Sequence, residues 1–146
     1  MPRLSLDVPT DVRLLDKGLS AGEALAAFNA ANPYAGGIAS FLGKVRSDNN
    51  AQALELSHYE PLTEPGMREL AGRVLERFGC DGLLVWHRVG VMVPGEAIVL
   101  VAAAAPHRRA AFDAVDFCMD YLKCASWFWK REKGAGGWHW IEPRAA

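Results

Sequence analysis

Cysteine is scarce in this chain of 146 residues, which has only Cys80, Cys118 and Cys124. An odd number without a C-x-x-C pair supports neither a disulfide framework nor a structural zinc site. Cys118 lies among apolar residues, which predicts a buried small hydrophobe. Cys124 follows Lys123 and suggests a sulfur carrier, but a single cysteine without a partner is more often inert. We therefore expect no metal site.

Long hydrophobic runs are also missing. The longest, from Ala97 to Ala105, stops at Pro106 after nine residues, whereas a membrane-spanning helix needs about 20. Residues 1–8 have neither the apolar core nor the small-residue cleavage site of an export signal. These absences predict a chain that does not cross a membrane and stays in the cytoplasm.

No sign of charge dominates, because 16 lysines and arginines oppose 17 aspartates and glutamates, for a net charge of -1. A protein that binds nucleic acid along its whole surface is usually basic, so any anion site here must be a local cluster. Hydrophobic residues make up 51% and charged residues 23% of the chain, as in soluble globular proteins. The length predicts one domain over residues 1–146.

Hydrophobic periodicity predicts an α+β fold. Helices are expected from a capping box at Ser20–Glu23 to residue 32, over 67–78 ending at Gly79, and from Phe112 to Leu122 with Val115 and Met119 on its apolar face. Strands are expected over 3–8, 37–45 with a bulge at Gly43, 51–59, 83–93, 97–105 after a Pro94-Gly95 turn, 127–130 and 138–141.

The start of the last predicted helix carries His107, Arg108 and Arg109 directly after Pro106. Cations at this end oppose the helix macrodipole. The helix start is therefore suited to an anion, because free backbone N–H groups and cationic side chains would converge on one phosphate or carboxylate. The alternative is that these side chains are simply solvated.

Four of the five tryptophans and three of the five lysines fall between Lys123 and Trp140. A lysine on an aromatic, water-poor surface loses hydration, which favours a neutral amine that acts as base or nucleophile. The alternative is a strand with core tryptophans and outward lysines. Positions seven apart lie on opposite faces of a strand, so Lys123 and Lys130 meet only if the chain bends between them.

The segment Gly43-Lys44-Val45-Arg46 lies at the end of a predicted strand and the entry to a polar loop, where binding groups are common, and Arg46 is able to fork onto a phosphate. A solvated strand end is the alternative. The acidic residues Asp113, Asp116 and Asp120 are interpreted as a solvated helix face and not as a metal site. His58 and His87 are interpreted as structural.

Taken in order, several motifs resemble the large, catalytic subunit of molybdopterin synthase. They are Ser40-Phe-Leu-Gly-Lys-Val-Arg46, His87-Arg-Val-Gly90 with Pro94-Gly-Glu96, Pro106-His-Arg-Arg-Ala-Ala-Phe112, Met119-Asp-Tyr-Leu-Lys123 and Phe128-Trp-Lys-Arg-Glu132. The resemblance covers residues 36–144 and implies an α/β hammerhead-type α+β fold with antiparallel sheets and two or three packed helices.

The resemblance also implies a homodimer flanked by two small ubiquitin-like sulfur-carrier subunits, which together form a heterotetramer. Each small subunit would insert a C-terminal Gly-Gly thiocarboxylate, whose sulfur passes to the pterin substrate, cyclic pyranopterin monophosphate, to build the molybdopterin dithiolene. No metal or other cofactor is implied, because the sulfur arrives already activated. Nucleic acid and membrane are not expected partners.

Site residues follow from the same resemblance. Lys123 matches the essential lysine, for acid/base or transient covalent work beside the thiocarboxylate carbonyl. Lys130, with Arg131 and Glu132, would position substrate or assist proton transfer. The remaining substrate-binding residues implied are Lys44, Val45, Arg46, His107, Arg108 and Arg144, the last reaching the neighbouring subunit's pocket.

Two departures accompany the resemblance. Trp127 stands where the family usually has proline, so the bend between the two lysines must have another origin. The segment 58–67 is a few residues longer than usual. Two other functions remain open: a non-catalytic relative, and a module that stacks single-stranded nucleic acid on Trp127, Trp129 and Trp138 with Lys130 and Arg131 on phosphates.

Overall fold

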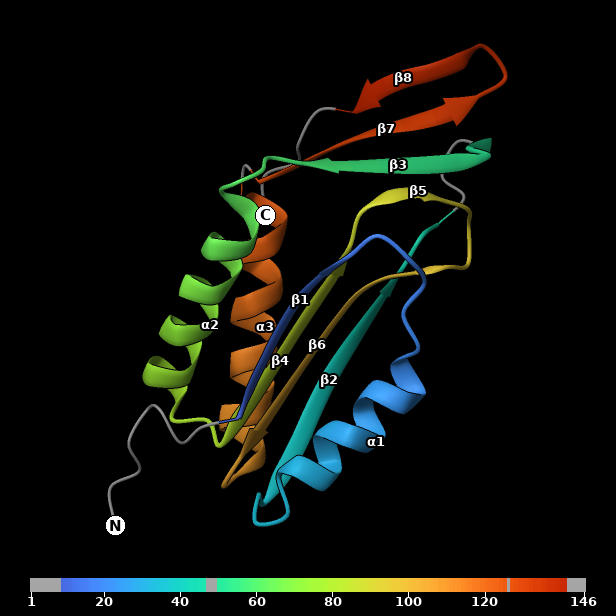
Figure 1. Cartoon of the computed structure of the whole chain (residues 1–146). Helices are drawn as coiled ribbons and strands as arrows, with labels where there is room; N and C mark the ends of the chain where they lie inside the picture. The colour runs from blue at the N-terminus through green and yellow to red at the C-terminus, as the bar shows by residue number, and fades with distance from the viewer. Residues whose placement is uncertain (1–8, 47–49, 126, 142–146) are drawn as a thin grey trace.

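The computed structural model describes residues 9–46, 50–125 and 127–141. Three helices and eight strands make up this part of the chain, in two sheets (Figure 1). The elements are β1 (Thr10–Leu15), α1 (Ala21–Ala31), β2 (Gly37–Lys44), β3 (Ala53–His58), α2 (Thr63–Phe78), β4 (Gly82–Arg88), β5 (Gly90–Met92), β6 (Ala97–Ala105), α3 (Arg108–Cys124), β7 (Phe128–Gly134) and β8 (Gly137–Ile141).

The first sheet has the strand order β1-β4-β6-β2. Helices α2 and α3 cover one face and α1 lies against the other (Figure 1). Strand β6 is buried from Val99 to Ala105. Its odd-numbered residues pack toward α2 and α3, and Leu100, Ala102 and Ala104 pack toward α1. Covered on both faces, the strand carries a continuous apolar run instead of alternation.

The second sheet has the order β5-β3-β7-β8, with all its pairs antiparallel. It lies at one end of the first sheet (Figure 1). One face covers a small cluster formed by Val45, Leu56, Val89 and Met92. His87 joins the two sheets, because its ring stacks on Phe128 of β7 with centroids 4.1 Å apart.

Most predicted elements are confirmed. The bulge lies between Gly43 and Lys44, and α2 ends at Gly79, whose φ is 63°. The Pro94-Gly95 turn is closed by the Glu96 N–H, which donates to the Val93 carbonyl at 3.2 Å, and Gly95 has φ 96°. The α+β class is confirmed, with one parallel pair, β1 and β4, within the mixed first sheet.

Several predictions were wrong in detail. Ser20 precedes α1 but forms no side-chain capping hydrogen bond, so the helix begins there without the capping box. The predicted strand 83–93 breaks at Gly90, whose φ of 97° diverts the chain from the first sheet into the second. Phe112, expected on the apolar face of α3, is 58% exposed because the buried face passes through Ala111 and Ala114 instead.

The N-terminal strand also differs. The predicted strand 3–8 lies outside the described residues, and the described strand β1 was not predicted. None of the described helices is long and apolar enough to span a membrane.

Candidate functional site

Helix α3 separates two groups of the predicted site residues. His107 is its N-cap, Arg108 is its first residue and Lys123 lies in its last turn. At a rise of about 1.5 Å per residue, the 15 residues from Arg108 to Lys123 span about 22 Å. One copy of the chain therefore does not bring the His107–Arg108 group to Lys123.

The N-terminal end of α3 is cationic and open. His107, Arg108 and Arg109 are exposed, and the first turn contains no acidic residue. His107 makes no side-chain cap, so the first backbone N–H groups are left for another acceptor. The start of β2 lies against this end, since a Cβ added at Gly37 would be 3.8 Å from the Arg108 Cα atom. The start of α3 thus brings together exposed cationic side chains and free backbone N–H groups, the features on which the predicted anion site depends.

The other end of β2 carries Lys44 and Arg46. Strand and helix both start at the contact between Gly37 and Arg108, and both run toward the end of the molecule that carries the second sheet, so the end of β2 at Lys44 and the C-terminus of α3 lie toward that end (Figure 1). Lys44 and Arg46 are exposed, whereas Val45 is buried between them. Val45 therefore fixes the backbone and is placed to contribute packing, not a charge.

Val45 is held by the turn that follows β5. Its N–H donates to the Glu96 carbonyl at 2.9 Å, and its carbonyl accepts from the Gly95 N–H at 2.8 Å. The Glu96 carboxylate in turn pairs with Arg88 at 2.8 Å and accepts from the Val93 N–H at 3.2 Å. The ion pair formed by Arg88 and Glu96 was not predicted. The signal for it in the sequence is the opposite charge of these two residues on either side of the predicted Pro94-Gly95 turn.

Lys130 lies on β7, opposite Leu56 of β3 and Ile141 of β8. Cross-strand partners share a face, so Lys130 and Glu132 project on the face that bears Leu56. Arg131 lies on the opposite face, where its Nε donates to Glu55 at 2.7 Å. Lys130 and Glu132 are thus brought together, and Arg131 is separated from them.

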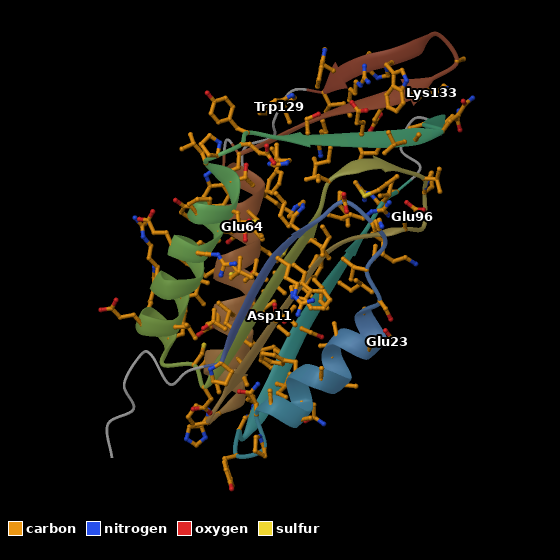
Figure 2. The ribbon with its side chains drawn as sticks, in the orientation of Figure 1. Asp11, Glu23, Glu64, Glu96, Trp129 and Lys133 are labelled. Atoms are coloured by element: carbon orange, nitrogen blue, oxygen red, sulfur yellow. The ribbon has the colours of Figure 1, made fainter. Side chains whose placement is uncertain are left out.

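The face of the second sheet that bears Arg131 is aromatic. The guanidinium lies 4.6 Å from the Trp138 ring centroid and 5.7 Å from that of Trp140. Trp129 lies on the same face, 38% exposed, and its ring is 6.4 Å from that of Tyr59. Figure 2 shows Trp129 and Lys133 near opposite ends of β7. Trp127 is not part of this surface, because it packs against the main core.

The chain changes direction between Lys123 and Lys130. Helix α3 ends at Cys124, and β7 begins at Phe128. The Trp127 carbonyl accepts the Tyr59 N–H at 3.0 Å, directly before β7 pairs with β3. Helix α3 therefore gives way to strand β7 between the two lysines, with Trp127 where the resemblance implies a proline. Arg144 lies outside the described residues.

The remaining titratable groups have structural surroundings. Burial raises the pKa of the Cys118 thiol to about 12 and that of Cys80 to about 11, which leaves both as unreactive thiols. Burial lowers the pKa of His87 to about 4, and its Nδ1 lies 2.9 Å from the Arg88 carbonyl, to which it donates. The described residues contain no group of three His, Cys, Asp or Glu side chains placed to hold a metal ion.

The family model and the curated relatives that match this chain point to the same protein family. The family model described as MoaE protein matches residues 15–125. The molybdopterin synthase catalytic subunit of Caulobacter vibrioides is 45% identical over 92% of this chain and 90% of its own. That of Pseudomonas aeruginosa is 38% identical over 92% of both chains.

Solved structures share the fold. The molybdopterin biosynthesis MoaE protein from Burkholderia ambifaria superposes with a TM-score of 0.81 at 35% identity, covering 94% of this chain and 92% of that one. A protein-protein complex of subunits 1 and 2 of molybdopterin-converting factor from Helicobacter pylori gives 0.80 at 20% identity, over 92% of both chains. On this evidence, the chain belongs to the MoaE protein family.

Proposed function

We propose that this chain is the catalytic subunit of a molybdopterin synthase, a sulfurtransferase that acts in the cytoplasm as one domain over residues 1–146. The observation that carries the proposal is the placement of Lys123 and Lys130 on either side of one bend, at the end of the molecule toward which Lys44 and Arg46 also lie. The names of the curated relatives supply the reaction.

In the proposed reaction, the small ubiquitin-like subunit brings sulfur as a C-terminal Gly-Gly thiocarboxylate. The sulfur forms a new bond to a carbon of cyclic pyranopterin monophosphate as the C–O bond at that carbon breaks, and the departing oxygen leaves as water or stays on the phosphate. The bond from sulfur to the carrier carbonyl then breaks when water adds there, leaving a carboxylate on the carrier and a thiolate on the pterin. Lys123 acts at that carbonyl as acid/base or as transient nucleophile. Lys130, with Glu132 on the same face, orients the pterin or moves a proton.

The predicted anion-binding residues His107 and Arg108 complete the site only in a homodimer. His107 and Arg108 lie about 22 Å along α3 from Lys123. Among the described strands, β2 is paired on one side only, with β6, and its Phe41 and Leu42 are 41% and 40% exposed. An open apolar edge strand favours pairing with another chain.

Antiparallel pairing of β2 with β2 of a second copy would place the start of each strand beside the end of the other. The His107–Arg108 end of one copy would then face the Arg46 and Lys123 end of the other, with phosphate held between the copies. Two small subunits on this homodimer give a heterotetramer, and Arg144 reaches toward the neighbouring pocket. The solved complex of two subunits from Helicobacter pylori supports a small-subunit partner.

Nucleic-acid binding is less well supported. Trp127 packs against the core and is withdrawn from Trp129 and Trp138. The Arg131 guanidinium is held by Glu55 and rests on Trp138, so it is not directed at a phosphate. The stacking surface required for a single strand is therefore incomplete.

The first experiment mixes the protein with a thiocarboxylated small subunit and cyclic pyranopterin monophosphate. Molybdopterin is then measured by the fluorescence of its oxidised derivative. Product is expected. Absence of product from a stable complex with the small subunit would instead identify a non-catalytic relative.

The shared site is tested by mixing two weakened variants, Lys123→Ala and Arg108→Ala, under conditions that exchange subunits. A mixed dimer has one site with both substitutions and one with neither. Activity should therefore recover to about a quarter of the wild-type value, measured at substrate concentrations below KM. No recovery in dimers shown to be mixed would place both residues in one chain's site and overturn the proposed arrangement.

A further inference from the structure

Trp127 is fixed through its backbone. Its carbonyl accepts the Tyr59 N–H at 3.0 Å. The hydroxyl of Thr63, which is 1% exposed, lies 2.9 Å from the Tyr59 carbonyl and 3.5 Å from the Trp127 carbonyl. The residue before β7 is thus tied both to the chain that leaves β3 and to the first residue of α2.

The indole ring of Trp127 fills the junction of two helices. A Cβ added at Gly66 would lie 2.7 Å from the indole Nε1 and closer still to two ring carbons. The ring therefore packs directly on the first turns of α2, where only glycine leaves room for it. On its other side the ring lies 5.7 Å from that of Tyr121, in the last turns of α3.

These contacts determine how α3 passes into β7. Lys123 is four residues before Trp127, and Lys130 is three residues after it. The Trp127 ring packs between α2 and α3, and the Trp127 backbone carbonyl accepts a hydrogen bond from Tyr59. Together these contacts fix the end of α3 relative to the start of β7. Proline, the residue expected here from the resemblance, would restrain the backbone through its ring, whereas tryptophan does so by packing.

We infer that Trp127 is a positioning residue, which holds Lys123 and Lys130 at the separation that sulfur transfer requires. The inference rests on the proposed function. It further assigns Gly66 as the site that accommodates the indole ring, because any side chain there would displace that ring. Both residues act on the reaction through the positions of the lysines.

The test compares Trp127→Ala, Gly66→Ala and Trp127→Phe with wild type in the reconstituted synthase. The first two should lower kcat by about 10- to 100-fold with KM within about twofold of wild type, since misplaced catalytic groups cost turnover more than binding. Trp127→Phe, which keeps a ring over Gly66, should restore kcat to within about threefold. Phe78→Ala is the matched control, because it removes a ring from the same helix pair at the far end of α2.

A second measurement does not depend on activity. Hydrogen exchange at the Tyr59 amide reports the bond to the Trp127 carbonyl and should quicken at least 10-fold in Trp127→Ala and Gly66→Ala, but not in Phe78→Ala. Wild-type kcat in a folded Trp127→Ala, or unchanged exchange at Tyr59, would overturn the inference. If wild type itself made no product, the proposed function would fail, and the exchange rates would still decide whether Trp127 sets the bend.

Discussion

The two sheets of the molecule differ in how deeply their strands are buried. In the first sheet, β6 is buried on both faces from Val99 to Ala105. In the second, no residue of β7 or β8 is fully buried, and Trp140 is 61% exposed. The first sheet has few polar groups to satisfy and packs closely. The second carries half-buried and exposed charged side chains on β7 and contacts the first through the stacking of His87 on Phe128. The following experiments test this difference.

The largest effect is expected for Lys123→Ala. Loss of an acid/base group should lower kcat for molybdopterin formation by about 100- to 10,000-fold. Because Lys123 is exposed, the free energy of unfolding and the binding of the small subunit should stay unchanged. The control is Lys133→Ala, which removes an exposed lysine on β7 and should retain activity. Wild-type turnover in Lys123→Ala would remove this residue from the reaction.

The stability side of the comparison is tested by Leu100→Ala in β6. Leu100 is 0% exposed, so truncation loses burial and leaves a cavity, which costs about 2 to 5 kcal/mol of unfolding free energy. Val91→Ala, at a position 52% exposed on β5, should change it by less than about 0.5 kcal/mol. Urea unfolding measures both. Equal losses would contradict the difference between the sheets.

The junction between the sheets should make stability depend on pH. Burial lowers the pKa of His87 from 6.5 to about 4, so between these values the unfolded chain binds a proton that the folded chain does not. Unfolding free energy should fall as pH drops from about 6.5 to 4, by up to about 3 kcal/mol. The slope should flatten in His87→Gln, as measured by unfolding at several pH values. An identical slope would show that His87 does not carry the effect.

The smallest effect is expected for Arg108→Ala, which removes a charge-assisted contact to substrate worth about 1.5 to 3 kcal/mol. KM for the pterin should rise by about 10- to 150-fold, with kcat less affected. Arg109→Ala, the next exposed arginine on α3, is the matched control. If both variants raised KM equally, general positive charge at the start of α3 would explain the binding, not a specific contact from Arg108.

Much of the fold follows from local pattern. Regular apolar spacing predicts α2, and Gly79 and Gly95 stand where a positive φ is needed. The break at Gly90 was missed because the strand keeps its β-rich composition across it, while the chain moves to another sheet. The exposure of Phe112 was missed because alanines, which carry little periodic signal, form the face of α3 that approaches the first sheet.

The candidate site was predicted unevenly. Residue type and order single out Lys123, Lys130, His107 and Arg108, since cations beside aromatics or at a helix start have a chemical reason to be there. Their separation could not be predicted, because distance depends on how elements pack. Arg131, adjacent to Lys130 in sequence, lies on the other face of β7 once the strand pairs with β3.

The sequence by itself determined the α+β class, the positions of the three helices and the residues with chemical potential, because these depend on spacing and side-chain type along a short stretch. Only the tertiary structure decided that the start of β2 lies against the start of α3, and that Trp127 packs on Gly66 before the chain enters β7. Such arrangements depend on contacts between residues far apart in sequence, which no local pattern specifies.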